Sequence, residues 1–149
     1  MKLLWIAIIG LAFCACTEPS ILIPEITGTY SLYDWQGKRP DGSTVFPYGA
    51  EARGQLMLSA DGHMSMQLEK NKRPALGTDK YETLDSSQVL EAYKGFFSYY
   101  GSYSLVPDSS IVVFEITGSK QPDWVGRKLR RGYSILGDTL VLSSPSTIG

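Results

Sequence analysis

Histidine and cysteine are scarce in this chain of 149 residues, which contains one histidine and two cysteines. The single histidine, His63, excludes a zinc site built from several histidines and leaves any Ser-His-Asp arrangement with only one base. The sequence also contains no Gly-x-Ser-x-Gly element and no glycine-rich loop of the kind that binds phosphate. We therefore expect no metal site and no cofactor.

An excess of charge of one sign is also lacking, because 14 Lys+Arg and 15 Asp+Glu residues give a formal net charge of −1. The longest basic group is the short segment Arg127-Lys128-Leu129-Arg130-Arg131, which a leucine interrupts. A strand with one solvated face accounts for this group. We therefore expect no nucleic-acid partner.

The one long hydrophobic run lies at the N-terminus, where Met1-Lys2 precedes the apolar residues 3–13. The run is short for a transmembrane span and has the charged start of a secretion signal, so residues 1–15 are predicted to be a signal peptide. Ala15-Cys16 resembles the end of a bacterial lipobox, in which the cysteine is lipidated and becomes the first residue. We expect lipidation at Cys16. The alternative is ordinary cleavage nearby, which leaves a soluble periplasmic or secreted protein.

Lipidation at Cys16 predicts attachment to the membrane of the cell envelope through the N-terminal lipid. Thr17 follows the cysteine instead of aspartate, which resembles the signal for delivery to the outer membrane, on its periplasmic side. Residues 16–26 contain two prolines and no helical period, so they predict an extended tether. Residues 27–149 have the length of one domain. If Cys14 leaves with the signal and Cys16 is acylated, no disulfide and no catalytic thiol remain.

The segment 52–70 predicts a tight β-hairpin, because two alternating runs flank Ala60-Asp61-Gly62. A two-residue loop would place Leu56 and Leu58 on the face of polar residues. A three-residue loop with Gly62 in the left-handed region sets Leu58 opposite Met64 and Leu56 opposite Met66, which matches apolar side chains. We adopt the second register. It places His63 on the polar face, as an exposed turn residue.

Other segments also alternate with period two, and turns separate them. Strands are expected at 27–36, 99–106, 111–117, 128–135 and 139–143, with a short one at 44–46. One helix is expected after an N-cap at Asp85 or Ser86, as a lid or plug; its apolar positions are Val89, Leu90, Tyr93, Phe96 and Phe97. The pattern predicts an all-β fold, an antiparallel up-and-down barrel of about eight strands with one helix inserted mid-chain. Such a barrel can hold one small ligand.

Three segments resemble the bacterial and fungal lipocalin-like domain family. Gly28-Thr29-Tyr30-Ser31-Leu32 is similar to the opening Gly-Thr-Trp-x-Leu of that family, with tyrosine in place of tryptophan. The hairpin, with Pro47-Tyr48-Gly49 before it, and the loop from Gly118-Ser119 through Pro122-Asp123-Trp124-Val125-Gly126 also match. The resemblance covers roughly residues 28–145. It implies a lipocalin-like (calycin) barrel with an interior, and names no ligand.

Arg131 is in phase with Leu129 and Tyr133, so its guanidinium is expected on the inner side of a strand, where it needs a partner. In lipocalins the opening tryptophan is covered by an arginine from a late strand, and by resemblance Tyr30 and Arg131 form that stacked pair. Glu115 is a second candidate partner, if the intervening loop is centred near Asp123. That pair could close the barrel floor or face a ligand.

Aromatic residues are dense in the middle of the chain: Tyr93, Phe96, Phe97, Tyr99, Tyr100, Tyr103 and Trp124. They are either ordinary core or, together with Met64 and Met66, the lining of an adaptable apolar cavity with Trp124 at its rim. The candidate ligand-binding residues are therefore Met64, Met66, Tyr99, Tyr103, Glu115, Trp124 and Arg131.

Three functions fit these features. The leading hypothesis is an envelope lipoprotein whose lipocalin-like barrel binds or carries a small hydrophobic molecule. The second is a cofactor-free enzyme of the isomerase or cyclase type, which needs Glu115, Arg131 or a tyrosine pointing into an open cavity. The third is a non-catalytic interaction module at the membrane surface, which an exposed apolar patch near Trp124 or on the helix would favour.

Overall fold

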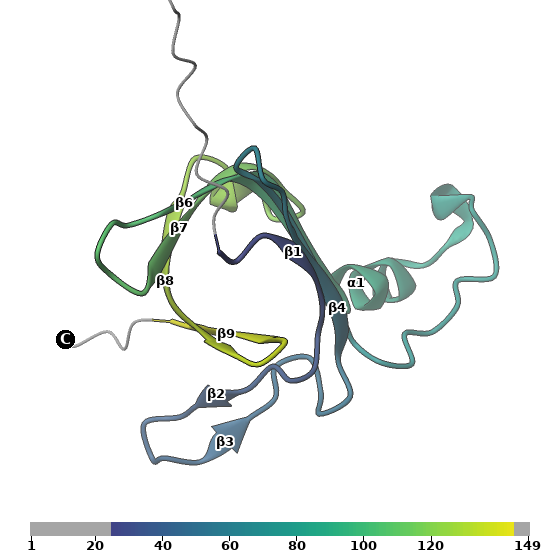
Figure 1. The fold of residues 1–149 in the computed structure, drawn as a ribbon. Coiled ribbons are helices and arrows are strands. Elements are labelled where there is room, and N and C mark those ends of the chain that lie inside the picture. The colour runs from purple at the N-terminus through teal and green to yellow at the C-terminus, as the bar shows by residue number, and fades with distance from the viewer. Residues whose placement is uncertain (1–24, 145–149) are drawn as a thin grey trace, which may run out of the picture.

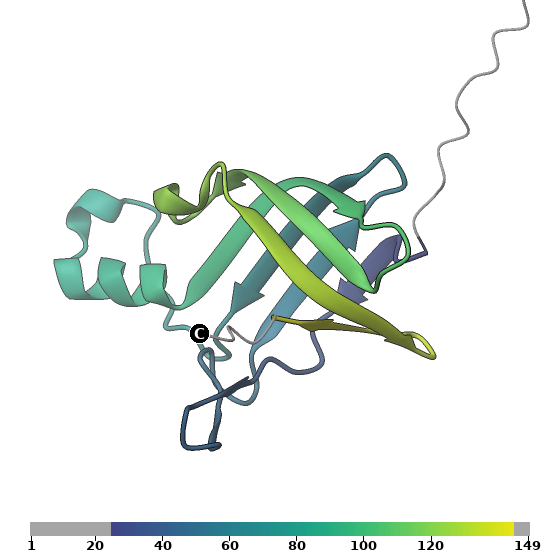
Figure 2. The ribbon, with the colours of Figure 1, turned by 90° about the vertical axis from the view of Figure 1, so that its left-hand side faces the viewer.

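A computed structural model describes residues 25–144 of the chain. The predicted signal peptide, the predicted lipidation site Cys16 and the predicted tether up to residue 24 lie outside the described residues. Seven antiparallel strands form one sheet in the order β1-β4-β5-β6-β7-β8-β9, which curves around a single axis (Figures 1 and 2). This arrangement confirms the predicted up-and-down barrel.

The strands of the barrel are β1 (Gly28–Ser31), β4 (Arg53–Leu58), β5 (His63–Glu69), β6 (Phe96–Leu105), β7 (Ile111–Ser119), β8 (Lys128–Leu136) and β9 (Thr139–Ser143). Two further strands, β2 (Gly37–Lys38) and β3 (Thr44–Val45), form a separate ribbon outside the barrel (Figure 1). The first strand is shorter than the expected 27–36. Within the described residues the edge strands β1 and β9 are not paired with each other, so the seven-stranded barrel is nearly but not fully closed.

The hairpin of β4 and β5 has the predicted register. Leu58 pairs with Met64 and Leu56 pairs with Met66. Gly62 has φ 84°, in the left-handed region that the three-residue loop requires. The prediction of a three-residue loop, made by matching the apolar rows of the two strands, is therefore confirmed.

Alternation along the strands places one row of each strand toward the axis of the barrel. The buried core contains Ile26, Leu58, Met64, Leu68, Phe97, Tyr99, Tyr103, Val112, Phe114 and Ile116. Nearly all of these residues lie on the central strands β4 to β7. The sheet is therefore most tightly packed at its centre, and less so toward its two edges.

Among the glycines of the described residues, Gly101 in β6 leaves the least room for a side chain, and it lies where the pairing with β7 shifts register. Gly101 is buried, and a Cβ atom at this position would lie 1.9 Å from the carbonyl oxygen of Glu115. No side chain can be accommodated there without moving the backbone of β7. The bulge therefore requires glycine.

The predicted helix is α1 (Ser86–Lys94), and its N-cap is Asp85. The Asp85 carboxylate accepts hydrogen bonds from the backbone N–H groups of Ser87 and Gln88, in a capping box. Phe96 and Phe97 were wrongly assigned to the helix: the helix ends at the C-cap Gly95, and both aromatics belong to β6. Bulky aromatic side chains in alternation favour the strand.

The position of α1 also corrects the prediction of a lid or plug. The helix lies outside the ring of strands in both views (Figures 1 and 2), and none of its residues is buried. Its Tyr93 hydroxyl donates to the carbonyl oxygen of Lys120 at 3.3 Å, while the Lys120 ammonium lies 3.5 Å from the centre of the Tyr93 ring. These contacts hold the helix against the outside of the barrel.

We predict that Gly101→Ala destabilises the domain by about 3 kcal/mol or more, because the added methyl group overlaps the backbone of β7. Urea unfolding followed by circular dichroism measures this free energy. Gly37→Ala is the matched control, since a Cβ there meets only the Val45 side chain at 3.4 Å. Equal unfolding midpoints for the two variants would show that the bulge tolerates a side chain.

Candidate ligand-binding site

The inward rows of the barrel form an apolar surface. Cross-strand pairs assign the rows, because residues directly opposite each other point to the same face: Met66 pairs with Tyr99, and Tyr103 pairs with Phe114. Met64, Tyr99 and Tyr103 are buried, with 3%, 5% and 5% of their surface exposed. Met66 is only partly buried. The structure therefore brings four predicted lining residues onto the inner face.

Two inward tyrosines use their hydroxyls to hold the backbone. The Tyr103 hydroxyl donates to the carbonyl oxygen of Ser59 at 2.9 Å and lies 3.2 Å from the Thr27 hydroxyl. The Tyr30 hydroxyl donates to the carbonyl oxygen of Ile26 at 3.1 Å. The Tyr103 hydroxyl thus joins the start of the described chain to the hairpin loop, whereas the Tyr30 hydrogen bond is local to the start of the chain. Tyr103 contributes its ring to the inner face, while its hydroxyl is already engaged.

Arg131 lies on the inner face, as its phase predicted. It pairs with Val112, which is completely buried, and is itself partly buried. One guanidinium nitrogen, Nη1, donates to the carbonyl oxygen of Arg130 at 2.9 Å. No carboxylate of residues 25–144 forms an ion pair with it. The cation is therefore only partly satisfied by the described part of the chain.

Tyr99 lies within the electrostatic influence of Arg131. Burial raises the pKa of the Tyr99 phenol to about 12, and the positive charge of Arg131 acts in the opposite direction. The Tyr99 hydroxyl makes no hydrogen bond within residues 25–144, although every fully buried side-chain oxygen and nitrogen there has a partner. It follows that the tip of this tyrosine reaches accessible space while its ring is buried.

Neither predicted partner of Arg131 forms the expected contact. The three cations that lie over aromatic rings within the described residues are Arg73, Lys120 and Arg127, so Tyr30 and Arg131 do not stack there. Tyr30 instead packs on the core and caps the backbone of Ile26. Tyrosine has a hydroxyl that can bind the chain locally, and this contact replaces the one that the family resemblance implied.

Glu115 lies on the outer face, which corrects its proposed position across from Arg131. It pairs with Lys128, and its carboxylate lies 3.2 Å from the Lys128 ammonium. The expected partner, Arg131, lies three positions from the actual partner, Lys128. Because side chains alternate between the two faces of a sheet, an odd shift of register places Glu115 on the opposite face from Arg131. Because both side chains are more than half exposed, this ion pair adds little stability.

Trp124 closes one end of the barrel against two inward aromatics. It belongs to the short 3-10 helix η2 (Pro122–Trp124), and its ring centre lies 4.9 Å from that of Phe97 and 5.8 Å from that of Tyr99. The Arg127 guanidinium lies 5.8 Å from the centre of the same ring. Trp124 lies between β7 and β8, as predicted, and packs against the rings of Phe97 and Tyr99. Its role at the rim of a ligand cavity stays a prediction.

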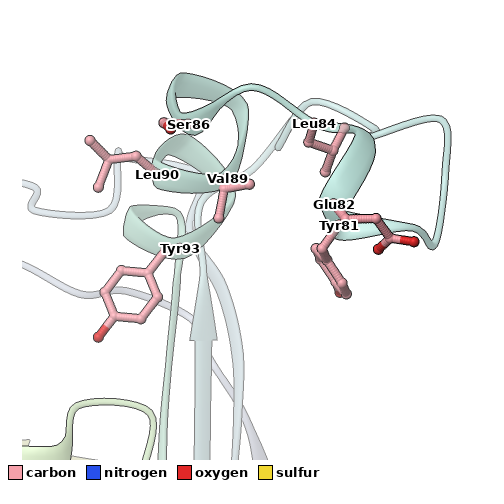
Figure 3. Close-up of a pocket in the computed structure, with 7 residues that line it drawn as sticks. All are labelled: Tyr81, Glu82, Leu84, Ser86, Val89, Leu90 and Tyr93. Atoms are coloured by element: carbon pink, nitrogen blue, oxygen red, sulfur yellow. The ribbon is translucent and has the colours of Figure 1, made fainter.

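Two surface hollows lie outside the barrel. The larger, about 470 Å³, is lined by Val89, Leu90 and Tyr93 of α1 and by the segment before it, which includes the 3-10 helix η1 (Tyr81–Thr83) (Figure 3). The other, about 380 Å³, lies over the outer face of β5, β6 and β7. Of the candidate ligand-binding residues, only Tyr99 lines either hollow, and it lines the second.

His63 is an exposed turn residue, as predicted. Its side chain is 76% exposed, and Nδ1 lies 3.2 Å from the Asp61 carboxylate. Hydrogen bonds lower the pKa of the Asp61 carboxyl to about 2; the larger effect comes from the Ser59 hydroxyl and the next from His63. This polar turn stabilises the hairpin loop and lies away from the inward rows.

The part of the chain at residues 25–144 contains no group of three or more histidine, cysteine, aspartate or glutamate side chains arranged to hold a metal ion. It also contains no helix with the length and apolar character needed to cross a bilayer. The candidate site is the inward face of the barrel, which contains Tyr99 and Arg131.

We predict that the Tyr99 phenol ionises near pH 12 and that Arg131→Met raises this midpoint further, because the substitution removes the cation that favours the phenolate. The folded pKa lies above the ordinary value of 10.0, so the neutral phenol stabilises the fold below pH 10 and this contribution is lost as the pH rises toward 12. Ultraviolet difference titration against Tyr99→Phe isolates this one tyrosine. An unchanged or lower midpoint in Arg131→Met would show that the two groups are not neighbours.

Comparison with known proteins agrees with this geometry. A family model described as a lipocalin-like domain matches residues 27–149. No curated protein and no solved structure matches the chain. The match covers the whole barrel, and with it the three segments whose motifs resemble the family. The chain belongs to the lipocalin-like domain family.

Proposed function

We propose that this protein is an envelope lipoprotein whose barrel binds a small hydrophobic molecule. A lipocalin-like barrel suggests ligand binding in general. The observation that carries the proposal is that the inward rows of β8 and β9 are apolar and yet only partly buried, at Leu129, Leu140 and Leu142. Apolar surface that stays accessible on a concave face is favourable for a hydrophobic ligand to cover.

Catalysis by the barrel has less support. An isomerase or cyclase needs an acid or a base beside its substrate, and Glu115 lies on the outer face. On the inward rows of the seven strands no carboxylate or imidazole occurs, and the ionisable groups there are tyrosines and Arg131. Tyr99, with its pKa raised to about 12, is a poor base at neutral pH.

A second candidate function is an interaction module at the membrane surface. The exposed apolar residues Tyr81, Val89, Leu90 and Tyr93 favour it, because they surround the hollow beside α1 (Figure 3). This surface is independent of the barrel interior. A variant that no longer binds a ligand in the barrel but still binds its partner at the membrane surface would favour this second function.

We predict that the full chain without its lipid, as a Cys16→Ser variant, binds the neutral fluorophore N-phenyl-1-naphthylamine with increased fluorescence. Met66→Trp should reduce binding about tenfold or more, because the larger ring fills the inner face beside Tyr99. Met57→Trp is the matched control, since Met57 is 40% exposed on the outer face of β4. Equal fluorescence for both folded variants, or none for the parent chain, would overturn binding inside the barrel.

The anchoring part of the proposal rests on the sequence of the N-terminal segment. We predict that the chain produced in a bacterium with two membranes begins at Cys16 and carries an acylated glyceryl group on that cysteine. Mass spectrometry of the N-terminal peptide measures it. Cys16→Ala should release the protein from the membrane fraction, whereas Cys14→Ala should leave both the lipid and the anchoring in place. A mature chain that begins elsewhere without lipid would support the secreted alternative.

A further inference from the structure

Two cross-strand rows on the outer face of the sheet carry no charge. Pairing defines them, because residues directly opposite each other on neighbouring strands share a face. The first row contains Thr29, Met57, Ser65, Tyr100 and Gly118, and the second contains Ser31, Gln55, Gln67 and Ser98. Charged side chains of both signs are usually interspersed over the surface of a soluble domain. An uncharged surface that spans several strands is therefore a distinct feature of this domain.

Charged residues border this neutral surface on two sides. On one side the next pair of β4 and β5 is Arg53 with Glu69. On the other side lies Glu115, whose carboxylate lies 3.2 Å from the Lys128 ammonium. The neutral rows thus lie between charged rows, so their lack of charge is not a property of the whole outer face.

Tyr100 supplies an aromatic surface within these rows. Its side chain lies over Gly118 on β7, where a Cβ atom would overlap Cε1 and Cζ of the ring. An aromatic ring that covers a glycine of a sheet is a stabilising contact. Yet 58% of Tyr100 remains exposed, so this contact uses only part of its surface. The rest of the ring is available to a ligand.

A hollow of about 380 Å³ adjoins the ring, and hydroxyl and amide groups line it. Ser65 lies directly opposite Tyr100, and Gln67 lies directly opposite Ser98. The Cβ atoms of opposite residues are about 4.5–5.5 Å apart, so these polar groups are within reach of a molecule that covers the ring. Hydroxyl and amide groups both donate and accept hydrogen bonds. The volume lies in the range of small-molecule sites, roughly 300–1,000 Å³.

Among the described residues that line this hollow, the one charged side chain is Lys120. Its ammonium is engaged by the protein: Nζ donates to the carbonyl oxygen of Phe96 at 2.5 Å and lies 3.5 Å from the centre of the Tyr93 ring. A ligand in the hollow therefore meets an aromatic surface and neutral hydrogen-bonding groups.

We propose that this outer face of β5 and β6 binds a neutral oligosaccharide built of pyranose units. One sugar ring stacks on Tyr100, because a pyranose presents C–H groups on its flat face and these cover exposed apolar surface. The hydroxyls at the edge of the sugar exchange hydrogen bonds with Ser65, Gln67 and Ser98.

A protein partner suits this face less well. The centre of a stable protein interface is formed by several apolar anchors in close-packed pockets, whereas these two rows contain the single aromatic ring of Tyr100. The proposed site lies on the outside of the barrel. It is therefore independent of the hydrophobic ligand proposed for the interior.

Amide chemical shifts in ¹H–¹⁵N NMR spectra of the full Cys16→Ser chain test this inference. The neutral probes are cellohexaose, xylohexaose, mannohexaose and maltohexaose, and hexagalacturonate is the charged counterpart. At up to about 10 mM, tenfold above a dissociation constant of about 1 mM, at least one neutral probe should shift the amides around Ser65 and Tyr100. Hexagalacturonate should bind more weakly, because its carboxylates lose hydration without gaining a free cation.

Variants locate the stacked sugar. Tyr100→Leu should weaken binding about tenfold or more, because leucine still covers Gly118 but has no flat ring. Tyr100→Phe keeps the ring and should bind within about threefold of the parent chain. Tyr33→Leu is the matched control, since Tyr33 is 94% exposed and lies outside the two rows. Gln67→Ala should weaken binding severalfold, and this variant locates the site if Tyr100→Leu does not fold.

The inference is overturned if no neutral probe shifts any amide, or if the shifts are confined to the inward rows or to α1. Equal affinity of Tyr100→Leu and the parent chain has the same meaning. Tighter binding of hexagalacturonate would overturn the neutral class. A dimer in sedimentation equilibrium that Tyr100→Leu abolishes would assign this face to a second copy of the chain instead. Failure of the fluorophore to bind inside the barrel would leave this site unaffected, so the two proposals fail separately.

Discussion

The cross-strand register of the barrel is the constraint on which the rest of the structure depends. Side chains alternate between two faces, so any odd slip of one strand exchanges its inner and outer rows. The matched pairs Leu58 with Met64 and Met66 with Tyr99 keep apolar rows together from strand to strand. The same rule places Arg131 inside, opposite Val112, and Glu115 outside, opposite Lys128. The chemistry of the inner face is thus a consequence of register.

The missing eighth strand shapes the molecule at its edges. Within the described residues β1 and β9 are not paired with each other, so each has one free edge, and a free edge exposes backbone hydrogen-bonding groups. The chain before β1 bridges toward the far side of the barrel, because Ile26 is completely buried and the Glu25 carboxylate accepts a hydrogen bond from Tyr133 on β8. The hydrogen bond that the Tyr133 hydroxyl donates to Glu25 raises the pKa of the Tyr133 phenol. The side of the barrel near β8 and β9 therefore lacks the strand pairing that would close it, and its inward leucines are only partly buried.

Arg131 is the one charged side chain on the inward rows of the seven strands, where most of the other residues are apolar, glycine or tyrosine. It is partly buried, and its guanidinium donates a hydrogen bond to the carbonyl oxygen of Arg130. The surface of α1 is a separate feature, since the helix packs outside the barrel through Tyr93 and Lys120 and leaves Leu90 exposed.

The amino-acid sequence by itself determined the local features: the alternating strands, the hairpin loop with Gly62 in the left-handed region, the N-cap Asp85 and the inward phase of Arg131. Each depends on neighbouring residues only. The sequence did not determine where β6 begins, because Phe96 and Phe97 suit both the helical period and the strand. It also did not determine the partners of Arg131 and Glu115, nor the outside position of α1. Only the tertiary structure decided these, because strand register and packing depend on loop lengths and on contacts between segments far apart in the chain.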